Sequence, residues 1–327
     1  MRGLAGAALG LALLAAPAAA CGTAETACAV SGSFGTGEYR LALPEAAGGA
    51  LTPQRTAGPR PPQGAAGTAP EGATDPGPPE GAAGALRPEG APPAEGARPL
   101  LPVVVVLHGW GGQAAVAIRS PVMAGEWLAA GHAVIAPQGA PRSDGDAGGA
   151  WNSRAAPEGR DDVAFLRAVL ADAAARAPID PSRALLGGFS GGGMMAWRVA
   201  CDAPGAFRAY LPVAGLLWRP LPEACAGPAP MLHVHGWSDP VVPLEGRSVA
   251  GGRITQGDLF AGLDLMREAN GCARDDPDAY ALGERFWRRG WRDCAGAPLA
   301  FALHAGGHEV PPGWAALALD WLQGAAE

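Results

Sequence analysis

A serine in a glycine-rich motif is the residue whose type and setting point most directly to chemistry. The motif Gly-Phe-Ser-Gly-Gly places Ser190 between an apolar run and a segment with helical spacing. This context predicts a strand, a sharp turn and a helix, with the serine in a strained backbone conformation and its hydroxyl exposed. In a chain with 50 glycines the pattern also arises by chance, so a glycine-rich turn with an incidental serine is the alternative.

A nucleophilic serine needs a general base and an acid that orients this base. When the serine lies on such a turn, the acid and then the histidine follow it along the chain. His308 fits the base because its glycine-rich loop follows the last predicted strand; a surface histidine is the alternative. Asp239 fits the acid because it follows the predicted strand 231–235, although an aspartate there also suits a simple turn. The rival acids, Asp264 and Asp275, fall in or beyond a predicted helix.

Backbone N–H groups are expected to stabilise the oxyanion that such a serine generates. One should follow the nucleophile, and the other should come from the loop after an early strand. Gly191 supplies the first N–H. Residues 108–112 (HGWGG) directly follow an apolar run, and we expect Trp110 to supply the second.

Three further tryptophans are candidates for substrate contact because they lie near predicted loops at the same sheet edge. These are Trp151, Trp237 and Trp314. Aromatic rings of this kind can pack on an aromatic or acyl group. Packing in the core or against a disulfide explains each of them equally well.

The elements that must position these residues alternate along the chain. Short, continuous apolar runs are typical of buried parallel strands, and longer segments have helical spacing. The predicted strands, besides the one ending at Ser190, cover 102–107, 132–136, 209–213, 231–235 and 299–303, with an edge strand at 38–44; the predicted helices, besides the one after Ser190, cover 114–130, 161–176, 256–270 and 312–323. This alternation predicts an α/β fold with a doubly wound, mostly parallel sheet and helices on both faces.

Composition divides the chain into four parts. Residues 1–20 read as a secretory signal peptide, with one arginine, an apolar run and small residues before Cys21. Residues 21–44 form the N-terminal strand region, and 99–327 form the catalytic domain. Residues 45–98 contain little but Ala, Gly, Pro, Glu, Arg and Thr, so we expect a disordered insertion. The predicted location is secreted or periplasmic, with lipid anchoring at Cys21 as the weaker alternative.

Export determines how the cysteines are interpreted. An even set in an oxidising compartment favours disulfides over metal ligands, and the chain has no C-x-x-C pair. Proximity in sequence suggests the pairs Cys21–Cys28, Cys201–Cys225 and Cys272–Cys294.

The charge pattern argues against several classes of partner. The net charge is −7, and every basic residue is an arginine, without a basic cluster suited to nucleic acid or an anionic membrane. Apart from the leader, no stretch is long and apolar enough to span a membrane. Oligomeric state is left open.

Six motifs together carry a family resemblance. They are LHGWGG at 107–112, AWN at 150–152, RDDVAFLRAV at 160–169, GFSGGGMMAWRVAC at 188–201, HGWSDPVVPLEGR at 235–247 and GGHEVP at 306–311. The chain resembles the secreted esterases grouped as polyhydroxybutyrate depolymerases, feruloyl esterases and acetylxylan esterases. The resemblance covers nearly all of the sequence outside 1–20 and 45–98. It implies an α/β-hydrolase with Ser190, Asp239 and His308 as its triad.

The resemblance implies hydrolysis of carboxylic esters through an acyl-enzyme, without a metal or organic cofactor. We expect a polyhydroxybutyrate depolymerase-like enzyme, with a feruloyl or acetylxylan esterase acting on plant polysaccharide as the alternative. A peptidase is a further alternative, since the same triad can cleave amides. A catalytically silent exported binding protein on a hydrolase scaffold is the non-enzymatic one. We expect no separate substrate-binding domain of the kind that some polymer-degrading members carry, which argues against attack on solid polymer.

The insertion yields the first testable prediction. Deletion of residues 45–98 is expected to leave ester hydrolysis largely intact, because neither the fold nor the predicted triad requires them. The deletion variant and the full chain should be compared with p-nitrophenyl butyrate as substrate. Loss of folding in the variant would show instead that the insertion packs against the domain.

Overall fold

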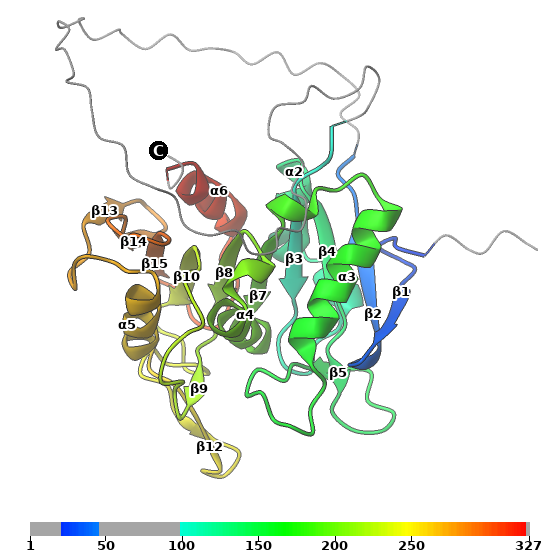
Figure 1. Ribbon diagram of the computed structural model, residues 1–327, viewed down its shortest axis with the longest axis horizontal. Coiled ribbons are helices and arrows are strands. Elements are labelled where there is room, and N and C mark those ends of the chain that lie inside the picture. The colour runs from blue at the N-terminus through cyan, green and yellow to red at the C-terminus, as the bar shows by residue number, and fades with distance from the viewer. Residues whose placement is uncertain (1–20, 46–98, 325–327) are drawn as a thin grey trace, which may run out of the picture. The chain divides into compact units, whose positions relative to one another are not determined.

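The computed structural model describes residues 21–45 and 99–324 (Figure 1). The predicted signal peptide and, apart from Glu45, the predicted insertion lie outside these residues. No helix of the described residues is long and apolar enough to cross a membrane.

A ten-stranded sheet forms the centre of the described part, in the order β1-β2-β4-β3-β7-β8-β10-β15-β14-β13. The six strands from β4 to β15 are parallel, and antiparallel pairs flank them on both sides. The strands are β1 (Cys28–Gly32), β2 (Gly35–Ala42), β3 (Val103–Leu107), β4 (Ala133–Pro137), β7 (Leu185–Phe189), β8 (Ala209–Val213), β10 (Met231–Gly236), β13 (Ala279–Leu282), β14 (Trp287–Trp291) and β15 (Leu299–His304). Two small ribbons comprise β5 (Ala140–Pro141) with β6 (Gly149–Ala150), and β9 (Trp218–Arg219) with β11 (Ser248–Val249) and β12 (Ile254–Gln256).

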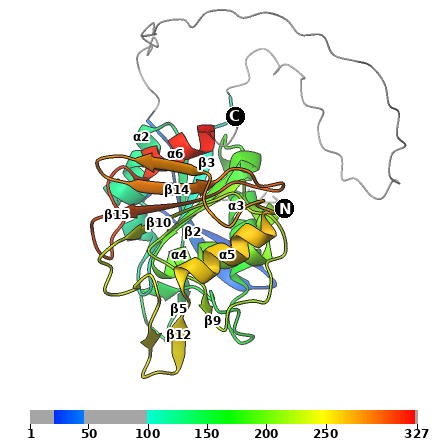
Figure 2. The ribbon, with the colours of Figure 1, turned by 90° about the vertical axis from the view of Figure 1, so that its left-hand side faces the viewer.

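Helices cover both faces of the sheet, as Figures 1 and 2 show. They are α1 (Ala114–Ala117), α2 (Glu126–Ala129), α3 (Asp162–Arg176), α4 (Gly191–Asp202), α5 (Leu259–Ala269) and α6 (Trp314–Gly324). Because side chains alternate along a strand, Val103 and Val105 of β3 pack with α3, α4 and α5 in one core. Val104 and Val106 pack with α1, α2 and α6 in the other core. The predicted doubly wound α/β architecture is confirmed, and it is the α/β-hydrolase fold.

Two local predictions were wrong. The single helix expected over 114–130 is interrupted, since α1 ends before Ser120 and a π-helical turn covers Pro121–Gly125 before α2. Pro121 has no N–H and disfavours helical backbone at the residue before it, and the Ser120 Oγ accepts a hydrogen bond from Met123 N and caps the new turn. Strands β13 and β14 were not predicted, because β13 (AYAL) is an apolar run of only four residues and β14 (WRRGW) has two arginines at its centre.

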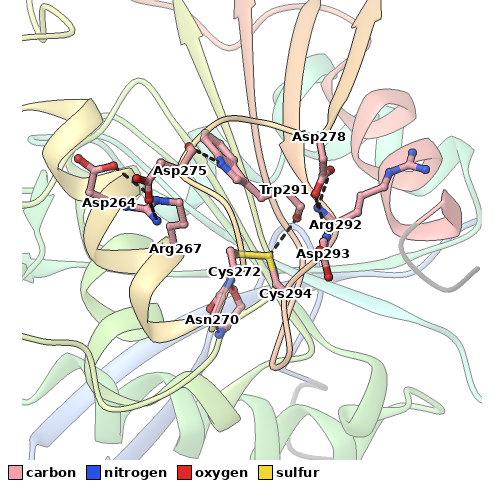
Figure 3. Close-up of a disulfide and its surroundings, with 11 residues drawn as sticks. Asp264, Arg267, Asn270, Cys272, Asp275, Asp278, Trp291, Arg292, Asp293 and Cys294 are labelled. Atoms are coloured by element: carbon pink, nitrogen blue, oxygen red, sulfur yellow. Dashed lines mark hydrogen bonds and ion pairs between the residues drawn. A yellow bond between two sulfur atoms is a disulfide. The ribbon is translucent and has the colours of Figure 1, made fainter.

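The three disulfides join the pairs that proximity in sequence suggested, Cys21–Cys28, Cys201–Cys225 and Cys272–Cys294. Cys272 follows α5 and Cys294 follows β14, so their disulfide ties this helix to the edge of the sheet (Figure 3). The Trp291 indole N–H donates to Asp275 O close to this link. Beside it, Arg267 forms an ion pair with Asp275 at 2.6 Å.

The loop lengths predict how much two of the disulfides stabilise the fold. The double variant C201S/C225S opens a link with a sequence separation of 24, which should lower the free energy of unfolding by about 3 kcal/mol. The matched variant C21S/C28S opens a link with a separation of 7 and should lose about 2 kcal/mol. Urea unfolding measures both values. A larger loss of stability in C21S/C28S than in C201S/C225S would contradict this dependence on loop length.

Candidate active site

The turn between β7 and α4 holds Ser190 in an unusual backbone conformation. Its φ is +55° and its ψ is −117°, a region that residues other than glycine rarely occupy. The turn can close because the neighbouring glycines have no side chains. A Cβ on Gly192 would lie 2.2 Å from the Leu107 carbonyl oxygen, and one on Gly188 would lie 2.4 Å from the Gly192 carbonyl oxygen. These contacts bring β3, β7 and α4 together directly beneath the serine.

Ser190, His308 and Asp239 form one continuous hydrogen-bonded chain. His308 Nε2 lies 2.9 Å from Ser190 Oγ, and His308 Nδ1 lies 2.7 Å from Asp239 Oδ2. The histidine comes from the loop between β15 and α6, and the aspartate follows β10, so the carboxyl ends of three strands supply the three residues. The ring of Phe189 packs against the imidazole at 4.8 Å between centroids. The structure thus brings together the three residues predicted from the sequence.

Asp239 lies in a pocket that keeps it ionised. Burial alone would raise the pKa of this carboxyl, but hydrogen bonds from His235, Val242 N, His308 and Val241 N outweigh burial. They hold the pKa of Asp239 well below its usual range. Oδ1 accepts both backbone N–H groups, at 2.8 and 2.9 Å, which leaves Oδ2 directed at His308. The carboxylate is therefore negative and fixed in orientation.

A buried relay of side chains runs from α4 to this carboxylate. Trp197 Nε1 donates to His233 Nδ1 at 3.0 Å, His233 Nε2 lies 2.9 Å from His235 Nδ1, and His235 Nε2 lies 2.7 Å from Val242 O. An indole nitrogen can only donate a hydrogen bond, and this fixes which atom donates in each of the following hydrogen bonds. His233 Nε2 donates to His235 Nδ1, and His235 Nε2 donates to Val242 O.

His233, the central member of this relay, is consequently neutral. Burial, and then the proximity of His235, lower the pKa of His233 well below its usual value. A second proton on His233 would set its Nδ1–H against the Trp197 N–H. His235 Nε2 also lies 3.4 Å from Asp239 Oδ2, so the relay ends beside the carboxylate. The linkage of these two histidines was not predicted.

Two backbone N–H groups lie beside the serine without protein acceptors. A Cβ on Gly191 would lie 3.1 Å from Trp110 N, so the two backbone segments are in contact. Among the described residues, neither the Gly191 N–H nor the Trp110 N–H has a hydrogen-bond partner. The Trp110 loop is held from behind, because His108 Nε2 accepts from Gly139 N and the Trp151 indole donates to His108 O. The site therefore presents two preorganised donors.

The tryptophans divide into exposed and buried pairs. Trp110 and Trp237 are 70% and 65% exposed, and Arg142 stacks over the Trp110 ring at 4.2 Å. Trp151 is buried and serves the loop contact described above. The prediction that Trp314 contacts substrate was wrong. Trp314 is fully buried and packs edge-on against Trp127, under β7, where Gly187 leaves room for its ring.

Across residues 21–45 and 99–324, no group of three or more His, Cys, Asp or Glu side chains is arranged to hold a metal ion.

The relay predicts a large cost for losing its central member. His233→Leu leaves the buried Trp197 N–H and His235 Nδ1 without partners, so the free energy of unfolding should fall by roughly 2–5 kcal/mol. His132→Leu is the control, because it removes one part-buried hydrogen bond to Ala130 O and replaces the contact of the imidazole with Trp127 by an apolar one, which should cost about 1 kcal/mol or less. Urea unfolding compares the two variants. Equal stability of His233→Leu and the parent protein would contradict the relay.

Comparisons with known proteins agree with this geometry. Residues 94–256 match the phospholipase/carboxylesterase family model. The protein named "Putative esterase NocK" from Nocardia uniformis subsp. tsuyamanensis is 36% identical over 150 residues, which cover 46% of this chain and 43% of that protein. Feruloyl esterase C from Emericella nidulans is 30% identical over 156 residues, which cover 46% of this chain and 52% of that protein.

The aligned region thus spans about half the length of these curated relatives. Among solved structures, the acetyl xylan esterase from Aspergillus awamori aligns with a TM-score of 0.48 and 15% identity, covering 68% of this chain and 89% of that chain. Over these regions the chain is similar in sequence to esterases, and its described residues have the α/β-hydrolase fold.

Proposed function

We propose that the protein is an exported serine esterase that hydrolyses carboxylic esters through an acyl-enzyme. The observation that carries this proposal is the hydrogen-bonded chain from Ser190 through His308 to Asp239, at 2.9 and 2.7 Å. Nucleophile, base and orienting acid need these contacts to act as a unit.

Each residue of this hydrogen-bonded chain has a role in the proposed reaction. Ser190 Oγ attacks the ester carbonyl while its proton passes to His308 Nε2, which then protonates the departing alcohol. In the second half, His308 takes a proton from water, the hydroxide adds to the acyl carbonyl, and Ser190 leaves with the proton. Asp239 accepts the Nδ1–H throughout and stabilises the imidazolium. The N–H groups of Trp110 and Gly191 would bind the oxyanion in both halves.

For the acyl group, an aromatic acid ester is the first candidate. Several relatives, including the one from Emericella nidulans, are named feruloyl esterase C. The exposed rings of Trp110 and Trp237 provide flat apolar surface on the two loops next to the catalytic groups, suited to an aromatic acyl chain. A polyhydroxybutyrate depolymerase-like activity remains the second candidate, because the sequence motifs resemble those enzymes as well. Methyl ferulate, acetylated xylan and 3-hydroxybutyrate oligomers, assayed in parallel, separate the candidates.

Export is part of the proposal. Three disulfides within the described residues suit an oxidising compartment, and residues 1–20 have the composition of a signal peptide. A silent binding protein on this scaffold would not need the complete set of catalytic groups.

The mechanism predicts hydrolysis of p-nitrophenyl butyrate and its loss on removal of the nucleophile. Ser190→Ala should lower kcat by on the order of 10³-fold or more. Ser248→Ala, which removes an exposed hydroxyl on β11, is the control and should keep its activity. Circular dichroism should show both variants folded. Activity that survives Ser190→Ala would exclude this serine as the nucleophile.

A further inference from the structure

A groove lined by arginines lies outside the catalytic groups. It encloses about 710 Å³ between the loop that follows Trp151 and the small ribbon of β9 and β12. Arg154 comes from the loop, whereas Arg219 and Arg253 come from the ribbon side. Positive charges from two separate segments therefore face one shared space.

These arginines are not neutralised by the protein. Within the described ranges, none of the three forms an ion pair or donates a side-chain hydrogen bond, and no carboxylate lines the groove. The chain as a whole has a net charge of −7, so acidic partners are not scarce. All three guanidinium groups are exposed to solvent, so none of them requires a protein partner. An anion in the groove would be attracted by all three at once, and the arrangement therefore favours an anionic ligand.

The two walls are braced against each other. The Trp218 indole donates to Ser153 Oγ at 2.9 Å, which links the residue before Arg219 to the residue before Arg154. Arg219 pairs with Thr255 in the ribbon, and Gly257 N donates to Leu217 O at 2.6 Å below it. The groove is thus held open by ordered backbone on both sides.

The same segments connect the groove to the candidate active site. The chain leaves β8 and reaches β9 through Gly215, where a Cβ would lie 2.4 Å from the Ser190 carbonyl oxygen. Trp151, three residues before Arg154, is bonded to the Trp110 loop through His108 O. In Figure 1, β9 and β12 lie beyond the carboxyl ends of β7 and β8, and Ser190 directly follows β7 in the chain.

We propose that this groove is a subsite for a carboxylate on the part of the substrate remote from the scissile ester. The inference rests on the proposed esterase function and specifies its substrate further. Guanidinium groups pair with carboxylates through parallel N–H···O bonds, and the side chains of Pro220, Leu221 and Ile254 offer apolar surface for the carbon skeleton. Two sources supply such a group: the uronate of an acidic polysaccharide, or the free end of a hydroxyalkanoate oligomer.

A contact remote from the reacting atoms that binds ground state and transition state alike should change KM and leave kcat unchanged. The double variant R219A/R253A should raise KM about tenfold for the 3-hydroxybutyrate trimer with a free carboxylate, or for acetylated glucuronoxylan. KM for the trimer methyl ester and for acetylated xylan without uronate should change less than twofold. R274A/R289A removes the same charge from exposed arginines elsewhere and is the matched control. The acidic substrate whose KM rises in R219A/R253A identifies the source of the carboxylate.

The possible outcomes separate this inference from the esterase proposal. Equal effects of R219A/R253A on acidic and neutral substrates, or no effect on either, would overturn the subsite. Failure of every ester, p-nitrophenyl butyrate included, would overturn the proposed function instead. If no ester is hydrolysed, calorimetric titration of Ser190→Ala with the free-acid trimer still measures binding of a carboxylate to the groove. Binding should be lost in the triple variant S190A/R219A/R253A, and equal binding to the methyl ester would count against a carboxylate site.

Discussion

The close approach of β3, β7 and α4 beneath Ser190 is the constraint on which the rest of the site depends. A carbonyl oxygen of β3 lies where any side chain at position 192 would have to stand, so only glycine allows the helix to begin there. With the helix starting so close to the strand, the serine must take a positive φ, and its hydroxyl is directed out of the turn. The same contact places the Gly191 N–H beside the Trp110 N–H. The strained turn thus sets the Ser190 hydroxyl beside two backbone N–H groups that have no protein acceptor among the described residues.

Two buried tethers then fix the other partners relative to this turn. The relay starts at Trp197 on α4 and ends at Val242 O, in the loop that carries Asp239. Side-chain hydrogen bonds therefore fix the position of this loop relative to α4. Asp239 in turn directs Oδ2 at His308 Nδ1. The second tether is the indole of Trp151, which holds the Trp110 loop. Buried hydrogen bonds of the core therefore also position the loops that carry Asp239 and Trp110.

Much of this arrangement could be predicted from local patterns. Chain order and position at strand ends singled out Ser190, Asp239 and His308, and proximity singled out the cysteine pairs. The relay escaped prediction because Trp197 and His233 are 36 positions apart and neither belongs to a motif whose chemistry demands the other. Trp314 was misplaced because its position near a loop said nothing about the space above Gly187. Strands β13 and β14 lack the apolar period that reveals a buried strand, and the arginine groove forms only when distant segments meet.

The central claim is that Ser190 carries the acyl group between the two halves of the reaction. Rapid acid quenching during turnover of p-nitrophenyl butyrate, followed by peptide mass spectrometry, tests this claim most directly. We expect one butyryl group on the peptide that contains Ser190, and fragmentation should locate it on the serine. The amount of this acylated peptide should decrease as hydrolysis proceeds. A butyryl group on another residue, or turnover without any covalent intermediate when deacylation is slowed, would contradict it.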